Sequence, residues 1–330
     1  MRRFQTLESL AADLGQPPYL AIGTFDGVHL GHRAVIGAMV RSARAAAAPA
    51  VVLTFLPHPL AVIRPAHAPP LLADFGQRAR LLEALGIEGL VELPFTPALA
   101  AVTPAVFVQE YLCRRAQARR AFVGADFTFG ARAKGTAESL AVLGRQACGL
   151  ETTVVPLRMQ GGGPISSTRI RQALGEGRPG EAARLLGRAF TMSGVVVPGE
   201  RRGRTLGFPT ANLALDGSLA QPMSGVYAVR CSGGEAAGPG VVPRWRPGVA
   251  NFGVRPTVGG QDQRLEVHLF DFDGDLYGLR LEVALLRRLR GERRFPNVAA
   301  LRRQIALDCA RARQLQVDAA DPDQGERAEQ

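Results

Sequence analysis

Two histidines near the start of the chain, His29 and His32, stand three residues apart in a stretch that reads GTFDGVHLGH at residues 23–32. If a helix begins by His29, both imidazole rings lie on one helix face and can donate hydrogen bonds to the same anion. The glycines of this stretch allow the backbone to approach a ligand closely. A lone histidine is more often structural, but this pair beside an Asp-Gly turn predicts a phosphate-binding site.

The segments on either side of this turn are suited to position it. Residues 18–22 form a short apolar run that is typical of a buried parallel strand, and residues 34–40 carry apolar side chains at helical spacing. A strand that turns directly into a helix presents free N–H groups and the positive end of the helix dipole to its surroundings. We therefore expect residues 23–32 to bind a nucleotide phosphate.

A second candidate clamp follows the glycine-rich segment GGGP at residues 161–164. The next residues, ISSTRIR at 165–171, are expected to begin a helix, with Ser166 or Ser167 as its N-cap. One interpretation is that the serines only cap this helix and that the arginines are solvated. The three glycines favour a mobile loop instead, in which hydroxyls, N–H groups and a guanidinium complement the histidine pair on a phosphate.

The loop at residues 199–212, with the sequence GERRGRTLGFPTAN, is a third candidate phosphate site. It lacks the G-K-[ST] signature and the following helix of a Walker loop. Because surface loops rich in glycine and arginine are common, the sequence alone leaves both interpretations open. Thr210 and Asn212 alternate along an extended chain, and their side-chain oxygens suit a hard cation such as Mg²⁺.

A candidate general base, Glu266, lies in the alternating run LEVHLFD at residues 265–271. Glu266, His268 and Phe270 share one face of the expected strand. A carboxylate that faces a pocket could take a proton from a hydroxyl nucleophile. The alternative is an exposed strand face, which the pattern by itself slightly favours.

The chain divides into two parts of different patterning. Alternating strand-like and helix-like segments up to about residue 157 predict a parallel α/β sheet, whose ligands bind at the carboxyl ends of the strands. Later β-rich runs predict a small antiparallel barrel or sandwich, with a closing helix at 297–315. The expected domains are 1–187 and 188–317, followed by a polar, disordered tail at 318–330. The predicted strands are residues 18–22, 50–55, 89–93, 121–123, 152–157, 191–197, 226–230, 265–270 and 281–286, and the predicted helices are residues 31–46, 77–85, 104–118 and 136–147.

The composition limits the class of partner. A net charge of +11 over 330 residues would suggest a polyanion, but Lys134 is the only lysine, so the charge reflects an arginine-rich composition. Aromatic residues are not interleaved with the basic clusters, so we expect no dedicated nucleic-acid surface. The sequence has neither an apolar run of membrane-spanning length nor a signal-peptide core, which predicts a cytoplasmic protein without membrane contact. A weak homo-oligomer is compatible with the sequence.

The four cysteines are widely separated and follow neither a metal-ligand spacing nor a dense disulfide pattern. We therefore expect reduced, inert thiols. They are Cys113, Cys148, Cys231 and Cys309.

These motifs together resemble those of the bacterial bifunctional riboflavin kinase/FAD synthetase family, from about residue 18 to residue 313. In the first half, residues 23–32, 124–130 and 166–171 are similar to the family's G-x-F-D-G-V-H-x-G-H, G-x-D-F-x-F-G and S-S-T-x-I-R. In the second half, residues 199–212 resemble G-x-x-R-G-R-x-x-G-F-P-T-A-N. This loop is followed by GVYA at 225–228, GVRPT at 253–257 and EVHLFDF at 266–272.

The resemblance implies an α/β Rossmann-like nucleotidyltransferase domain, followed by a mainly β, six-stranded antiparallel flavokinase barrel with a C-terminal helix. It implies that the barrel phosphorylates riboflavin with ATP to FMN. It also implies that the first domain adenylylates FMN with ATP to FAD and pyrophosphate. Mg²⁺ is the expected cofactor of both reactions, and riboflavin, FMN, FAD and ATP are the expected partners.

The resemblance also implies roles for individual residues. His29 and His32 would align the ATP phosphates in the first domain. In the barrel, Thr210 and Asn212 would hold Mg²⁺ with ATP, and Glu266 would be the base that activates the riboflavin 5′-hydroxyl. The other residues implied to bind ATP or its phosphates are Gly23, Phe25, Asp26, Gly31, Asp126, Ser167, Thr168 and Arg171 in the first domain and Gly199, Arg201, Gly203, Arg204, Gly207 and Pro209 in the barrel.

The chain departs from the family pattern at two places. Arg78 stands where lysine is expected, which could alter a phosphate contact, and Ala189-Phe190 replaces the usual Pro-Tyr at the linker. Three alternatives remain: a single-activity adenylyltransferase with the barrel as a flavin-binding module, a class I synthetase-like enzyme, and an arginine-rich RNA-binding protein. The absence of a K-M-S-K-S-like loop argues against the synthetase.

Overall fold

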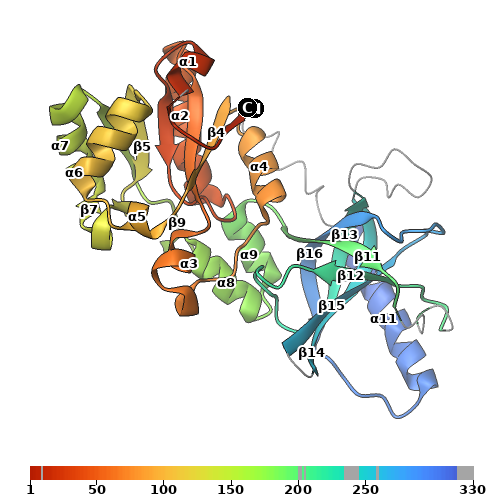
Figure 1. The fold of residues 1–330 in the computed structure, drawn as a ribbon. Coiled ribbons are helices and arrows are strands. Elements are labelled where there is room, and N and C mark those ends of the chain that lie inside the picture. The colour runs from red at the N-terminus through yellow and green to blue at the C-terminus, as the bar shows by residue number, and fades with distance from the viewer. Residues whose placement is uncertain (9, 200–202, 204–205, 234–244, 258–259, 318–330) are drawn as a thin grey trace. The chain divides into compact units, whose positions relative to one another are not determined.

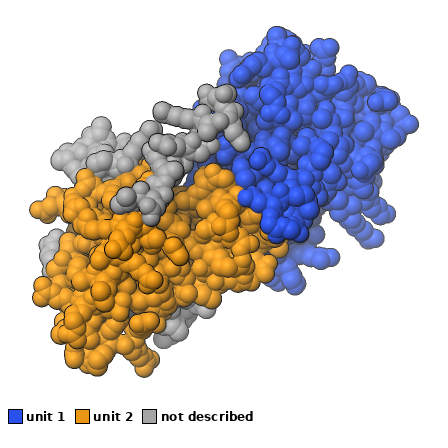
Figure 2. All heavy atoms as spheres, turned by 180° about the vertical axis from the view of Figure 1, so that it is seen from behind, with its two compact units in different colours: residues 1–167 blue, residues 168–330 orange. Residues whose placement is uncertain are grey.

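The computed structural model describes residues 1–317 apart from residues 9, 200–202, 204–205, 234–244 and 258–259. The chain forms two compact units, residues 1–167 and residues 168–330 (Figure 2). The tail expected to be disordered, residues 318–330, and two of the residues expected to bind ATP in the barrel, Arg201 and Arg204, lie outside the described residues.

The first unit is built on a parallel β-sheet with the strand order β1-β4-β3-β2-β5-β8 (Figure 1). The central strands are apolar throughout because both faces of the sheet are covered, and every residue of β2 is buried. The parallel sheet and its five predicted strands are confirmed, and β1 adds an edge strand. The strands are β1 (Arg2–Phe4), β2 (Tyr19–Ile22), β3 (Ala50–Leu56), β4 (Gly89–Pro94), β5 (Arg120–Gly124) and β8 (Glu151–Val155).

The four predicted helices of the first unit are confirmed, although the third begins as a short α-helix, α6, and continues as a π-helix, η2. Polar side chains fix where helices begin: Asp74 and Thr136 accept hydrogen bonds from N–H groups in the first turns of α4 and α7. The helices are α1 (Leu10–Leu14), α2 (Leu30–Ala45), α3 (Pro59–Ile63), η1 (Pro65–His67), α4 (Phe75–Glu83), α5 (Pro97–Ala100), α6 (Pro104–Val106), η2 (Phe107–Arg115), η3 (Ala131–Ala133) and α7 (Ala137–Cys148).

Alternate residues of the central strands pack on opposite faces of the sheet and produce three layers. Leu20 and Ile22 of β2 pack in one core with side chains of η2 and α7. Tyr19 and Ala21 of the same strand pack in a second core with side chains of α2 and α4. The sheet is therefore held between two apolar cores, which fixes the loops at the carboxyl ends of its strands.

Two short hairpins accompany this sheet. One pairs β6 (Thr128–Phe129) with β7 (Gly135–Thr136), and the other pairs β9 (Met159–Gln160) with β10 (Gly163–Pro164). The turn of the second hairpin consists of two glycines with positive φ angles, which a two-residue hairpin turn favours. The glycine-rich segment, which the sequence predicts to be a mobile loop, is therefore a hairpin with a defined turn.

The expectation of four reduced thiols is wrong for one pair of cysteines. Cys113 in η2 and Cys148 at the end of α7 form a disulfide, with the sulfur atoms 2.06 Å apart. The two helices pack against each other, which brings together residues that are distant in the sequence. Cys231 and Cys309 are free and buried, and burial raises the pKa of both thiols, which keeps them protonated and inert.

The second unit contains a closed antiparallel barrel with the strand order β11-β12-β15-β14-β13-β16. This settles the choice between barrel and sandwich that periodicity left open. Four of its strands were predicted, whereas β12 and β14 were not. The strands are β11 (Phe190–Val197), β12 (Ala211–Leu215), β13 (Gly225–Gly233), β14 (Arg246–Thr257), β15 (Gly260–Leu269) and β16 (Arg280–Arg290).

Large side chains that point inward fill the barrel; Tyr227, Phe252 and Leu265 are completely buried. The closing helix, α11 (Val298–Val317), is confirmed and packs on the outer face of β13 and β14 (Figure 1). There it forms a small core with Phe270. Because strand residues alternate between the two faces, the outer face carries both this apolar patch and the polar residues beside it.

Two helices follow the sheet in the sequence and precede the barrel, α8 (Ser167–Gly175) and α9 (Pro179–Leu186). Helix α9 packs against β11 and β16 of the barrel and ends at Gly187, which adopts the left-handed conformation. By contacts, the second unit begins at Thr168. The functional domain boundary at residue 187 stays a prediction.

Candidate active sites

A cavity of about 1380 Å³ lies at the carboxyl ends of the strands of the first unit. The chain leaves β2 in one direction toward β3 and later returns to place β5 on the other side of β2. Ligands in open α/β sheets bind in the crevice at such a switch point. Seven of the residues that the sequence individually predicts for the site of the first domain line the cavity: Gly23, Phe25, His29, Gly31, His32, Asp126 and Ser167.

The turn after β2 has a backbone that few sequences could adopt. Phe25, Gly27 and Val28 all have positive φ angles, of 47°, 79° and 43°. A Cβ atom at Gly27 would lie 2.8 Å from the Cβ of Leu72, so only glycine fits at this position. Phe25 and Val28 are buried, and their apolar contacts hold the left-handed conformation in place.

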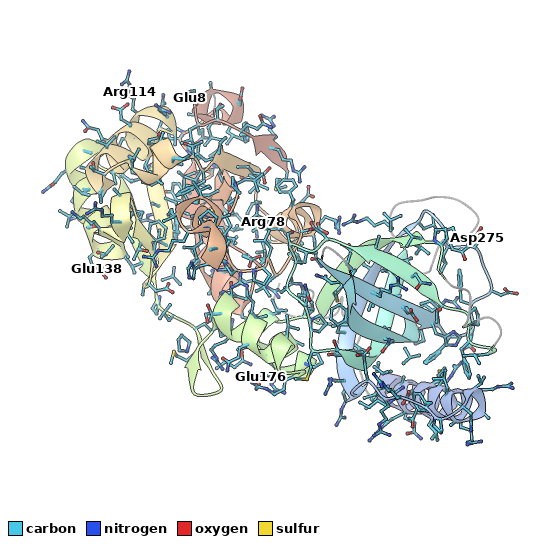
Figure 3. The ribbon with its side chains drawn as sticks, turned by 60° about the horizontal axis from the view of Figure 1, so that its bottom comes forward. Glu8, Arg78, Arg114, Glu138, Glu176 and Asp275 are labelled. Carbon is cyan, nitrogen blue, oxygen red and sulfur yellow. A yellow bond between two sulfur atoms is a disulfide. The ribbon has the colours of Figure 1, made fainter. Side chains whose placement is uncertain are left out.

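The carbonyl oxygen of Thr24 anchors this turn from below. It accepts hydrogen bonds from Thr54 Oγ1, at 3.1 Å, and from Arg78 Nη1, at 3.3 Å. Arg78 extends from α4 (Figure 3) and is buried. Its Nη2 lies 3.8 Å from Oε1 of Glu92. Burial lowers the pKa of Arg78, and the neighbouring carboxylates of Glu92 and Asp26 partly offset this effect.

The position of Arg78 tests the expectation that this residue could alter a phosphate contact. The side chain does not line the cavity. It donates instead to the backbone beneath the turn, so it positions the turn. Sequence comparison with a motif could find the unusual arginine but not the direction in which it points.

Asp26 is also buried, at 2% exposure, and it connects three segments. Its carboxylate Oδ1 accepts the backbone N–H of Leu72 at 2.9 Å. Its carbonyl oxygen accepts the hydroxyl of Ser167 at 3.0 Å, which ties the turn to the first residue of α8. The contact between the two predicted clamp motifs is therefore made through the backbone of Asp26, while a direct contact of this carboxylate with ATP stays a prediction.

The two histidines lie together as expected. Their rings stack with centroids 3.5 Å apart, and Phe25 packs edge-on against His32. His29 is the N-cap of α2: its Nδ1 accepts the N–H of His32 at 3.2 Å, so the neutral ring carries its proton on Nε2. The Nδ1 of His32 is buried without a hydrogen-bond partner among the described residues.

The electrostatics of the pair favour an anion. Burial, and next the neighbouring His29, hold the pKa of His32 well below its usual value. His32 is therefore neutral near pH 7 when nothing is bound. An anion beside the ring would favour the protonated form and reverse this shift.

Several cavity residues were not predicted from the sequence. Three arginines, Arg64, Arg132 and Arg158, add positive charge to the rim. Three aromatic rings, Phe55, Phe95 and Phe107, extend the apolar wall begun by Phe127 and Phe129 of the predicted motif at 124–130. The unpredicted residues come from separate segments of the chain, Phe55 from the end of β3 and Phe107 from the start of η2, so no local motif joins them.

Two further residues of the predicted clamp, Thr168 and Arg171, follow Ser167 in α8. Thr168 is exposed and Arg171 is half-buried. Both belong to the second compact unit, so their approach to the phosphates stays a prediction.

On the barrel, the loop before β12 packs two of its glycines on the predicted metal ligands. A Cβ atom at Gly199 would lie 2.2 Å from Asn212 Nδ2, and one at Gly203 would lie 3.0 Å from Thr210 Oγ1. Side chains at these positions would displace both polar groups. The loop therefore lies against the two residues that were predicted to bind Mg²⁺.

The end of this loop is fixed to β15. His268 Nδ1 lies 2.8 Å from the carbonyl oxygen of Pro209, and the His268 ring packs edge-on against Phe208. Gly207, with a φ of 85°, makes the turn that precedes Phe208. These contacts place Thr210 at the start of β12 on the outer face of the barrel.

Glu266 stands directly opposite Asn212 in the antiparallel pair β12–β15. Both side chains are half-buried and lie on the outer face, since their neighbours Leu213 and Leu265 point into the core. Residues paired in this way have Cβ atoms about 5 Å apart. Among the described residues, the side chains of Thr210, Asn212 and Glu266 make no hydrogen bond or ion pair, so they are available to a ligand.

Comparison with known proteins gives the same order of parts. The family model described as FAD synthetase matches residues 13–169, and the model described as riboflavin kinase matches residues 186–316. The bifunctional riboflavin kinase/FMN adenylyltransferase of Escherichia coli K12 is 40% identical over 90% of this chain and 92% of its own length. The Bacillus subtilis enzyme of the same name is 35% identical over 88% of this chain and 89% of its own.

The chain belongs to the family of bifunctional riboflavin kinases/FMN adenylyltransferases. It phosphorylates riboflavin to FMN and adenylylates FMN to FAD, both with ATP. The riboflavin kinase model matches the six barrel strands and α11 up to its last residue, which argues against the alternative that the barrel only binds flavin. The synthetase-like and RNA-binding alternatives find no support.

The structural comparison agrees on the fold. A crystal structure described as a macrolide-efflux protein from Streptococcus pneumoniae matches with a TM-score of 0.81 and 33% identity, over 93% of this chain and 96% of that chain. In the described part of this bifunctional riboflavin kinase/FMN adenylyltransferase, no helix has the length and apolar character needed to span a membrane.

Proposed function

We propose that the cavity of the first unit is the adenylyltransferase site and that the row Thr210, Asn212 and Glu266 on the barrel is the kinase site. The observation that carries the first assignment is the stacked pair His29 and His32 at the N-terminus of α2, inside the cavity at the switch point. The second rests on Glu266, which stands opposite Asn212 and makes no side-chain hydrogen bond or ion pair within the described part of the chain.

In the adenylyl transfer, a phosphate oxygen of FMN attacks the α-phosphorus of ATP. The bond from that phosphorus to the β-bridging oxygen breaks, and pyrophosphate leaves. FMN arrives already ionised, so the site needs no strong base; it must align the reactants and neutralise charge. His29 Nε2, the N–H groups of α2 and a protonated His32 supply such donors, and Ser167, Thr168 and Arg171 would complete the clamp.

The aromatic wall of the cavity suits the flavin ring of FMN. Phe55, Phe95 and Phe127 provide planar apolar surfaces against which an isoalloxazine ring can pack. The same lining also carries the two histidines and three arginines, which can bind phosphate groups. The cavity therefore offers both apolar and basic groups, as an aromatic nucleotide requires.

In the phosphorylation, Glu266 takes the proton of the riboflavin 5′-hydroxyl while that oxygen attacks the γ-phosphorus of ATP. The bond from the γ-phosphorus to the β–γ bridging oxygen breaks, and ADP leaves. An alcohol is a poor nucleophile, and a positioned base contributes roughly 10²- to 10⁴-fold in rate. Glu266 is the carboxylate of this row.

The donor set on the barrel fits Mg²⁺. Thr210 and Asn212 offer neutral oxygens. Gly203 and Gly199 pack against these side chains and restrict their positions. Mg²⁺ in kinase sites takes few protein ligands, because water and substrate phosphates supply the others. When bound, the ion would neutralise charge on the ATP phosphates.

The Mg²⁺ dependence of FMN formation tests this assignment. Thr210→Ala and Asn212→Ala should each raise the Mg²⁺ concentration that gives half-maximal kinase rate, with the FMN-to-FAD reaction unchanged. Thr191→Ala is a matched control, since Thr191 lies on β11 about 20 Å from Val197, the register partner of Asn212. An unchanged Mg²⁺ requirement in both variants would overturn the assignment.

The setting of the protein completes the proposal. A cytoplasmic location is consistent with the sequence, and the partners are the small molecules riboflavin, FMN, FAD and ATP rather than a nucleic acid or a membrane. A weak homo-oligomer stays a prediction, and sedimentation of the purified chain over a range of concentrations tests it.

A further inference from the structure

Asn251 is the third polar residue in a row across the outer face of the barrel. On β15, Glu266 pairs with Asn212 of β12 on one side and with Asn251 of β14 on the other. Asn251 is half-buried, while Ala250 and Phe252 on either side of it are buried in the barrel core. The three side chains therefore point the same way from three adjacent strands, with Glu266 in the middle.

The side chain of Asn251 has no partner among the residues that the structure describes. Among the described residues, neither its carboxamide oxygen nor its nitrogen makes a hydrogen bond, as is also true of Asn212 and Glu266. A carboxamide can donate and accept at once, as a hydroxyl group does. The row thus presents an amide, a carboxylate and a second amide to whatever binds on this face.

Asn251 has an apolar neighbourhood on one side and a charged residue on the other. The neighbouring outer-face positions Val226 and Val249 are buried in the core beneath α11. The next outer-face position on β14 is Gly253, and a Cβ atom there would lie 2.6 Å from Glu292 Oε1. Asn251 therefore stands between an apolar patch and a second carboxylate.

The direction of phosphoryl transfer assigns the two amides to different substrates. The donor and acceptor oxygens lie roughly in line on opposite sides of the transferred phosphorus. If Asn212 holds ATP with its metal and Glu266 receives the proton of the attacking hydroxyl, the acceptor alcohol extends away from Asn212. Asn251 lies on that side.

We propose that Asn251 binds the acceptor alcohol, through the ribityl hydroxyl next to the one that is phosphorylated. This inference rests on the roles proposed for Asn212 and Glu266. Asn251 contributes binding and orientation, and no bond to it forms or breaks. It is a residue that distinguishes a polyol acceptor from water or a simple alcohol.

Steady-state kinetics of FMN formation test the proposal. Asn251→Ala should raise the KM for riboflavin about tenfold, as expected for one lost hydrogen bond, and should leave the KM for ATP and the Mg²⁺ requirement unchanged. Asn212→Ala should show the reverse. Ser232→Ala is the control, because Ser232 lies on the same face of β13, six residues from Val226, the partner of Asn251.

A substrate analogue separates a direct contact from a structural effect. For the unmodified protein, the KM for 4′-deoxyriboflavin should be about tenfold higher than the KM for riboflavin. Asn251→Ala should not raise the KM for the analogue any further. Full additivity of the two changes, or a raised KM for ATP, would overturn the proposal. If Asn251→Ala removes the melting transition of the barrel, Asn251→Ser is used instead. It too should raise the KM for riboflavin and leave the KM for 4′-deoxyriboflavin unchanged.

The outcome also distinguishes this proposal from the one it rests on. If Glu266→Ala keeps its kinase activity, the assignment of the base fails, whatever Asn251 does. If Glu266→Ala is inactive while Asn251→Ala has an unchanged KM for riboflavin, only the role of Asn251 fails.

Discussion

The imidazole rings of His29 and His32 stack with centroids 3.5 Å apart and an angle of 18° between their planes. This contact follows from the capping of α2, because His29 Nδ1 accepts the N–H of His32 and holds the first ring over the second. Two protonated imidazoles at this distance would repel each other. The pair is therefore poised to take up a proton when an anion arrives.

Proton uptake is the first consequence. The pKa of His32 is low in the free protein, because of burial and then of His29, and phosphates beside the ring should raise it. Between these two pKa values, ATP binding takes up a proton, so the affinity for ATP at this site should fall as the pH rises through the higher value. Calorimetry of ATP binding in buffers of different ionisation enthalpy measures this uptake.

His32→Asn is the control for proton uptake, with Thr210→Ala and Asn212→Ala as background to weaken ATP binding at the kinase site. The buffer dependence should disappear in His32→Asn. Binding without any proton uptake in the unmodified protein would show that the ring stays neutral beside the phosphates. His32 also makes the free energy of unfolding depend on pH. In the unfolded chain its imidazole takes up a proton near pH ~6.5, whereas in the folded protein it stays neutral to a lower pH, so stability should decrease as the pH falls from that value toward the lowered pKa.

Arg78 should affect only adenylyl transfer. Arg78→Met removes a charged donor to the Thr24 carbonyl, worth about 1.5–3 kcal/mol, so kcat/KM for FAD formation should fall roughly 10- to 150-fold. Arg78→Lys keeps the charge and one donor and should lose less. FMN formation serves as the internal control, and an equal loss in both reactions would mean that Arg78 supports the fold at large.

Gly199 offers a test of the kinase site that removes no functional group. Gly199→Ala would place a methyl group 2.2 Å from Asn212 Nδ2, so it should displace the amide and lower the rate of FMN formation at least tenfold. Gly180→Ala is the matched control, since no atom lies within 4 Å of the added group. Equal rates for the two variants would show that Asn212 does not need its observed position.

The Cys113–Cys148 disulfide should stabilise the first unit. It closes a loop with a sequence separation of 35 residues, for which chain entropy predicts about 4 kcal/mol. The double variant Cys113→Ser and Cys148→Ser should therefore melt at a lower temperature in the first unit, while a transition of the barrel stays in place. Calorimetry with and without a dithiol reductant tests this, and a reductant that lowers neither transition would argue that no such bond forms.

The sequence predicted the architecture because its signals are local. The apolar run of β2 and the capped helix α2 can both be recognised from about thirty residues of sequence. These two elements are enough to place the histidines. Strand β14 was missed for a local reason as well. It contains Pro247, Gly248, Gly253 and Pro256, which are turn signals in isolation but occupy one long strand of a closed barrel.

What the sequence could not predict depends on register and packing. Asn251 meets Glu266 only because β14 and β15 pair in one particular register. The two bonded cysteines meet only because η2 packs on α7. The direction in which Arg78 points depends on the path of α4 beneath the turn. Each of these is a tertiary relationship between segments far apart in the chain.

The division of labour between the two sites is the central claim, and a crossed measurement of two variants tests it most directly. Riboflavin-to-FMN and FMN-to-FAD conversion, both with ATP and Mg²⁺, are followed by chromatographic separation of the flavins. Glu266→Ala should lower the first rate by roughly 10²- to 10⁴-fold and leave the second intact, and His29→Ala with His32→Ala should do the reverse. Equal loss of both reactions in either protein would contradict the account.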